Sequence, residues 1–210
     1  MTIRHHPSDE SVLALANGSL PEALSLVVGA HVDGCAVCGK TVRMSETMGG
    51  VFLESASPTA LNEGALSQVL ARLDMPASLP KPAAFSQPQN VIQLPPALRQ
   101  YPVGSRRWLA PGIWTRPILK DRVQGTRVYL LGAAAGKALP RHRHHGVEMT
   151  QVLEGEFFDD GVHFGRGDFL EADGGHEHRP IVGIDGDCVC VIASEGVPRG
   201  LVGLLMRAFT

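Results

Sequence analysis

The sequence lacks a long apolar run, a cluster of basic residues and a rich supply of aromatic side chains. No apolar stretch approaches the roughly 20 residues that span a bilayer, and the start of the chain contains no apolar secretion segment. The basic side chains are scattered, whereas binding to phosphates requires them on one face. We therefore expect a soluble cytoplasmic protein that contacts neither membrane nor nucleic acid directly.

Cysteine is scarce as well. The four cysteines form two close pairs, Cys35/Cys38 and Cys188/Cys190, and histidines lie near the first pair. This pattern is typical of metal chemistry in a reducing compartment rather than of a disulfide framework. Because aromatic residues make up only 5% of the chain, a small N-terminal domain would have few large side chains for a core, and bound zinc would stabilise it.

Proline divides the chain. Six prolines lie between Met75 and Pro96, where neither a helix nor a central strand can continue through them. We predict a helical domain over residues 1–75, a proline-rich linker over 76–96 and a second domain over 97–210.

Helical spacing dominates the first part. Ser8 is a suitable N-cap for a first helix, and Pro21 suits the first turn of a second. A third helix is expected from about Cys35 to Leu53, and a fourth is indicated by an apolar face formed by Leu66, Val69, Leu70 and Leu73. The N-terminal domain should therefore contain four helices.

The periodicity changes to two after the linker. Residues 127–130, 149–158 and 187–192 are expected to form strands, separated by glycine-rich turns. Many short strands indicate a sandwich or barrel, so the whole chain is α+β and multidomain. The segment 201–206 fits either a last strand or a short helix.

A first group of candidate metal ligands comprises His6, His31, Cys35 and Cys38. Because Asp33-Gly34 should interrupt the helix, we place His31 at the end of the second helix and both cysteines in the first turn of the third, where a helix N-terminus favours the thiolate. His6 would complete a tetrahedral zinc site from the first helix. Alternatives are His5 in place of His6, a redox pair of thiols, and core cysteines without metal.

The arrangement His6, then His31-x3-Cys35-x2-Cys38, resembles the zinc-binding anti-sigma factors, and all four ligand positions of that family are filled. The resemblance implies a zinc-stapled four-helix domain that wraps a group IV (extracytoplasmic-function) sigma factor and blocks its access to RNA polymerase.

A second group lies downstream. Alternation places His142 and His144 on one strand face, and the chain must bend, at Gly146, for Glu148 to reach them. Spacing leaves His176 and His178 as equal candidates for a fourth ligand.

These segments resemble the paired motifs of the cupin superfamily, and that resemblance selects His178. It implies a jelly-roll-like β-barrel that binds a divalent metal; zinc is expected, although these ligands also accept iron, manganese or nickel. Asp173 stands where the second motif usually has proline, and the asparagine that usually follows is missing.

Two further features carry weaker signals. Cys188 and Cys190 lie on one strand face, which fits a small buried core or a signal-sensing pair. Asp159-Asp160-Gly161 is typical of a hairpin turn and requires no catalytic carboxylate.

Ligand types, their order and the linker together resemble the ChrR group of zinc anti-sigma factors over essentially the full chain. This implies a one-to-one complex with a sigma factor, released in response to reactive oxygen such as singlet oxygen through the cupin domain, and no enzymatic activity. A cupin-type metal-dependent dioxygenase is the main alternative. A zinc-stabilised DNA-binding protein is disfavoured by the net charge of −3 over residues 1–85.

Overall fold

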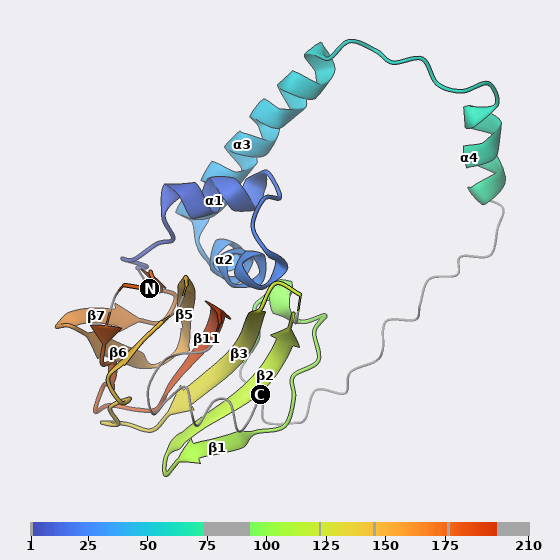
Figure 1. Cartoon of the computed structure of the whole chain (residues 1–210). Coiled ribbons are helices and arrows are strands. Elements are labelled where there is room, and N and C mark those ends of the chain that lie inside the picture. Colours follow the sequence, from blue (N-terminus) through green and yellow to red (C-terminus); the bar gives the residue numbers. More distant parts are fainter. Residues whose placement is uncertain (1, 74–92, 122, 145, 176, 197–210) are drawn as a thin grey trace.

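A computed structural model describes residues 2–73, 93–121, 123–144, 146–175 and 177–196 (Figure 1). Four helices precede a cupin-like β-sandwich, as predicted. Most of the expected linker, the alternative ligand His176 and the closing segment 201–206 lie outside the described residues, and the domain boundaries stay predictions.

The helices are α1 (Asp9–Ala16), α2 (Glu22–Gly34), α3 (Ala36–Ser55) and α4 (Ala65–Leu73). The Ser8 hydroxyl accepts a hydrogen bond from the Ser11 amide, so the predicted N-cap is confirmed. The interruption predicted at Asp33-Gly34 is confirmed, because α2 ends at Gly34 and α3 begins at Ala36, with the chain turning at Cys35 between them. The Asp33 carboxylate also accepts from the Ala97 amide at 2.9 Å, so it holds the next part of the chain.

No single helix among the described residues has the length and apolar character needed to cross a bilayer. Helices α2 and α3 satisfy those criteria only as a pair, and they are bent by 114° at their junction.

In the part of the chain that the structure describes, the strands form three antiparallel sheets. Their bounds are β1 Arg107–Ala110, β2 Ile113–Lys120, β3 Thr126–Ala133, β4 His142–Arg143, β5 Glu148–Glu154, β6 Glu156–Asp159, β7 Val162–Gly165, β8 Phe169–Ala172, β9 Glu177–His178, β10 Ile181–Val182 and β11 Cys188–Glu195. The large sheet has the order β1-β2-β3-β11-β5-β8, and the smaller ones are β10-β6-β7 and β4-β9.

The strand region expected over residues 149–158 consists of two strands, because the turn at Gly155, one of the expected glycine turns, divides it into β5 and β6. Gly155 has a φ of +71°, and a Cβ there would lie 2.2 Å from the Asp187 carbonyl oxygen. Both the backbone angle and the close approach require glycine.

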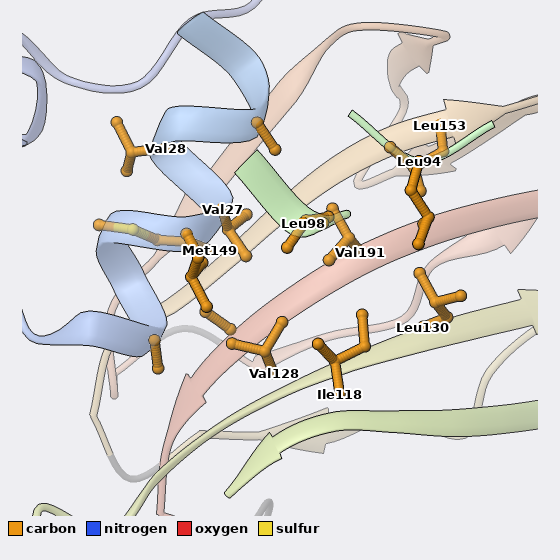
Figure 2. Close-up of a cluster of buried hydrophobic side chains, with 14 of the residues drawn as sticks. Val27, Val28, Leu94, Leu98, Ile118, Val128, Leu130, Met149, Leu153 and Val191 are labelled. Atoms are coloured by element: carbon orange, nitrogen blue, oxygen red, sulfur yellow. The ribbon is translucent and has the colours of Figure 1, made fainter. Parts of the chain in front are cut away.

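The central strands of the large sheet, β3, β11 and β5, are buried on both faces. Side chains such as Val128 and Val191 point outward and pack with Val27 and Val28 of α2 (Figure 2). The alternate residues, including Tyr129, point inward and pack with the smaller sheet. Helix α2 is therefore part of the same core as the barrel wall.

A short 3-10 helix, η1 (Pro96–Leu98), helps to hold α2 in place. Leu98 is fully buried and Leu94 almost so, and both belong to the cluster that joins α2 to the sheet (Figure 2).

Helices α3 and α4 are much less embedded. Along α3 only Cys38 and Gly39 are buried, and α4 has no buried residue. Figure 1 shows α3 leading away from the barrel, with α4 lying apart from the other helices.

Candidate metal centres

The structure brings His6, His31, Cys35 and Cys38 together as predicted. His6 Nδ1 lies 3.4 Å from Cys35 Sγ, 3.5 Å from Cys38 Sγ and 3.4 Å from His31 Nε2. Cys38 Sγ lies 3.5 Å from His31 Nε2. The four donor atoms are all within 4.8 Å of one another.

These distances fit one tetrahedral ion. With bonds of about 2.0 Å to nitrogen and about 2.3 Å to sulfur, tetrahedral zinc holds nitrogen and sulfur donors about 3.5 Å apart and two nitrogens about 3.3 Å apart. A set of two imidazoles and two thiolates also has the chemistry of a closed structural zinc site.

Three elements deliver the donors. His31 lies in the last turn of α2, Cys35 is the N-cap of α3 and Cys38 lies in the first turn of α3. His6 precedes the N-cap of α1, so the prediction that it lies in the first helix is wrong. The alternative ligand His5 is placed elsewhere, with its ring 4.6 Å from that of Phe164.

The His31 ring is oriented by the barrel. Its Nδ1 lies 3.1 Å from the Gly167 carbonyl oxygen, which can only accept, so Nδ1 carries the proton and Nε2 presents a lone pair to the cluster. Burial and the neighbouring His6 lower the pKa of His31 to about 4, which keeps the ring neutral.

The redox alternative fits the structure less well. A reactive thiol needs a lowered pKa, whereas burial and the hydrogen bond with Cys35 raise the pKa of Cys38 to about 12. A bound cation reverses this trend, because it stabilises the thiolate directly. The cluster is therefore suited to holding a metal.

The second predicted group also converges. His178 Nε2 lies 2.8 Å from His144 Nε2 and 3.1 Å from His142 Nε2, and Glu148 Oε2 lies 3.2 Å from His144 Nδ1. All four residues are buried. Two imidazole nitrogens bound at about 2.1 Å lie about 3.0 Å apart when their bonds are at right angles, so this set fits a divalent ion that retains room for other ligands.

Hydrogen bonds set the tautomers here as well. His142 Nδ1 donates to the Pro140 carbonyl oxygen at 2.9 Å, and His178 Nδ1 lies 2.8 Å from Asp159 Oδ2. Each Nε2 then faces the cluster with a lone pair. Hydrogen bonding and charge from Asp159 outweigh the effect of burial and raise the pKa of His178.

Asp159 is the functional residue that sequence reasoning missed. The predicted turn exists, since Asp160 and Gly161 have positive φ values and β6 pairs with β7 around them. Asp159, however, ends β6 on the same buried face as Phe157. Alternation from Phe157 is the signal that could have revealed an inward-facing carboxylate.

Glu148 reaches the cluster through the predicted bend at Gly146. A Cβ at Gly146 would lie 2.5 Å from the Glu195 carboxylate, so any larger residue would have to displace the Glu195 side chain. Burial raises the pKa of Glu148 to about 7, and the Tyr129 hydroxyl donates to its carboxylate. A bound cation would favour the ionised form.

A cavity of about 380 Å³ adjoins this second cluster. Its lining is mainly apolar, from residues such as Ile113, Leu131 and Leu170, and includes His142, Glu148 and His178. Cys188 and Cys190 also line it as free, buried thiols whose sulfurs are 3.7 Å apart. The arrangement can admit a small apolar molecule beside a metal ion and two thiols.

Comparison with known proteins identifies the family. The ChrR cupin-like domain matches residues 103–197. The anti-sigma-E factor ChrR of Cereibacter sphaeroides is 38% identical over 203 residues, which cover 95% of this chain and 93% of that protein. The chain belongs to the ChrR family of anti-sigma factors.

The structure agrees with membership of the ChrR family. ChrR of Rhodobacter sphaeroides, solved as a crystal structure of SigE in complex with this anti-sigma factor, matches with a TM-score of 0.75 and 34% identity, covering 92% of this chain and 99% of that one. A protein of unknown function with a cupin-like fold from Ralstonia eutropha is 19% identical and matches with a TM-score of 0.43, over 49% of this chain and 77% of that one. The predicted resemblance to the ChrR group is confirmed.

Proposed function

We propose that this protein binds a group IV sigma factor in a one-to-one complex in the cytoplasm and prevents it from reaching RNA polymerase. It does so without direct contact with nucleic acid or membrane. The observation that carries the proposal, beyond family membership, is the apolar surface of α3 and α4.

Helix α3 exposes an apolar stripe at helical spacing. Its members are between 59% and 69% exposed: Val37, Met44, Met48, Val51 and Phe52. Helix α4 exposes one face between 50% and 75%, made of Leu66, Val69, Leu70 and Leu73. Monomeric proteins rarely leave such extended apolar surface in water, and flexible methionines suit a protein interface.

We further propose a structural zinc ion at His6, His31, Cys35 and Cys38. The staple joins the segment before α1 to α2 and α3 within a domain of residues 1–75, which the linker of residues 76–96 connects to the barrel of residues 97–210. The ion would hold the two cysteines as thiolates and fix the angle at which α3 leaves the body.

The second ion is proposed at His142, His144, Glu148 and His178. We expect zinc, with iron, manganese or nickel as the other candidates. The cavity beside this site supports a sensing role for the barrel, in which reactive oxygen such as singlet oxygen leads to release of the sigma factor. Cys188 and Cys190 are candidate participants because they line the same cavity.

We propose that the barrel is a sensor and not an enzyme. The same ligands and cavity would suit a metal-dependent dioxygenase, which is the competing function. Oxygen uptake by the iron-loaded protein with a small diketone or thiol would support the dioxygenase function. Absence of uptake, together with binding of the sigma factor, would support the regulatory function.

The decisive experiment is co-expression of the full chain with a group IV sigma factor from the same organism, followed by measurement of the complex and of bound metal. Phe52→Ser should weaken binding of the sigma factor by about 1 to 2 kcal/mol, or roughly 5- to 30-fold. The reason is that the Phe52 ring, exposed in the free protein, would be buried in the complex, and serine cannot replace that apolar contact. Leu66→Glu, on the apolar face of α4, should also weaken binding of the sigma factor.

Matched controls lie on the polar faces of the same helices. Glu46→Gln on α3 and Gln68→Glu on α4 should leave the affinity unchanged. Equal affinities for Phe52→Ser, Leu66→Glu and these controls would refute the proposed interface, and absence of any complex would refute the proposed function.

A further inference from the structure

The segment Gly167–Glu171 of the barrel contacts the N-terminal metal cluster and the chain on either side of His6. The Gly167 carbonyl oxygen orients His31, and the Phe169 ring lies 5.4 Å from the His31 ring, edge to face. One side of β8 thus touches the α2 ligand of that cluster.

The same segment also holds the chain on both sides of His6. Asp168 Oδ1 accepts from the Arg4 amide at 2.6 Å and from the His5 amide at 3.0 Å, and the Phe169 amide donates to the His5 carbonyl oxygen at 3.1 Å. On the other side of His6, the Glu171 carboxylate accepts from the Ser8 amide at 3.1 Å and from the Ser11 hydroxyl at 2.8 Å.

His6 needs this support more than the other three donors. It is exposed, whereas His31, Cys35 and Cys38 are buried, and it lies before α1 in a segment with no regular secondary structure. Packing and helix geometry therefore do little to fix it, and the hydrogen bonds to the barrel hold its backbone.

We infer that Gly167–Glu171 forms the outer shell of the N-terminal metal centre, with Asp168 as a positioning residue that slows loss of the ion. The inference rests on the proposed zinc site. Asp168 is buried and uses both oxygens, since Oδ2 accepts from the Gly165 amide at 2.9 Å. Asparagine supplies only one acceptor oxygen, so its NH2 group would face another N–H donor.

Strand β8 also faces the second site. Leu170, between Phe169 and Glu171, points to the opposite side and lines the cavity, and Ala172 pairs with Glu148. A change on the cavity side of β8 therefore reaches the N-terminal centre through the backbone of a single short strand.

The test uses the full chain loaded with cobalt(II), because sulfur-to-cobalt charge-transfer absorption reports the thiolate site directly. Release is followed after adding excess chelator. Asp168→Asn should accelerate loss of this band about 10-fold or more, the usual effect of removing a group that orients metal ligands. Asp185→Asn, on an exposed loop of the same barrel, should match the parent.

A rate for Asp168→Asn within twofold of the parent would overturn the inference. If Asp168→Asn does not fold, Glu171→Gln tests the inference in its place, because Glu171 is exposed and its loss frees only the Ser8 side of the segment. A rate of metal release from Glu171→Gln equal to that of the parent would also overturn the inference. Absence of the charge-transfer band in the parent would refute the proposed zinc site itself.

The coupling through β8 has its own test. Leu170→Ala should accelerate release of the metal ion from the parent protein. It should add little when Asp168→Asn is already present, because that substitution removes the hydrogen bonds that connect β8 to the segment around His6. Additive effects of the two substitutions would overturn coupling through this strand.

Discussion

Removal of the N-terminal ion should free α3 while α2 stays on the barrel. Among the described residues, the apolar cluster around this centre has three buried members, Val12, Cys35 and Cys38, and Ile3, Val32 and Val42 pack against it partly buried. By contrast, α2 buries Ala23, Leu24, Leu26, Val27, Val28 and Ala30 in the cluster that it shares with the sheet. The two helices therefore depend on different interactions.

The magnitudes favour the metal as the main support of α3. Full burial of one valine stabilises by about 1.5 to 3 kcal/mol, and the two small thiols and the three partly buried side chains each add less. A structural zinc ion contributes roughly 10 to 16 kcal/mol in small zinc-dependent folds. Helix α3 has little stability of its own, because Gly49 and Gly50 lie within it and most of the stability of a helix in a protein comes from packing, which α3 largely lacks.

Hydrogen exchange measured by mass spectrometry checks this prediction. After chelation, confirmed by elemental analysis, amides of α3 should lose protection by on the order of 100-fold or more, while those of α2, β3 and β11 keep theirs. Cys38→Ser should reproduce the pattern without chelator. His142→Ala serves as the control, because it removes a ligand of the other cluster only.

Two outcomes would refute the reasoning. Unchanged protection of α3 after proven loss of the ion would mean that apolar contacts suffice to hold it. Simultaneous loss of protection in α2 and α3 would mean that the helices unfold as one unit, and the separation drawn from their different cores would be wrong.

Three other substitutions test the barrel. Asp159→Asn should weaken metal binding at the second cluster about 10- to 100-fold by releasing His178, as measured by metal competition. Leu98→Ala should lower the free energy of unfolding by about 2 to 5 kcal/mol in denaturant titration, because the side chain is fully buried between α2 and the sheet. Gly146→Ala should reduce the metal content of the second cluster in elemental analysis, since the new methyl group meets Glu195 and displaces the bend.

Both ligand sets could be predicted from the sequence because their geometry is mostly local. His31, Cys35 and Cys38 lie within eight residues. One helix ends just before Cys35 and the next begins just after it, so the three side chains can be arranged in few ways. His142 and His144 follow from alternation alone. The distant member His178 depended on resemblance to cupins, because spacing did not separate it from His176.

What escaped prediction depends on contacts between distant parts of the chain. Asp159 approaches His178 only through the folding of β6 against the barrel interior, and the Asp168 contacts join residues more than 160 positions apart. Asp33, expected only as part of the break between two helices, also accepts a hydrogen bond from the Ala97 amide, 64 positions away. Local rules for helix ends cannot anticipate a partner that far along the chain.

One sequence feature did carry information about the docking of the helices. From Cys188 to Ala193 the chain is continuously apolar, without the alternation expected of a strand that has one face in water. In the structure Cys188 and Cys190 face the cavity side while Val189 and Val191 face α2, so each face of β11 has its own neighbour. Strand β11 thus separates α2 from the cavity by a single layer of backbone. A change of packing on the cavity side can act on the helices through direct contact, and transmission through the linker is not required.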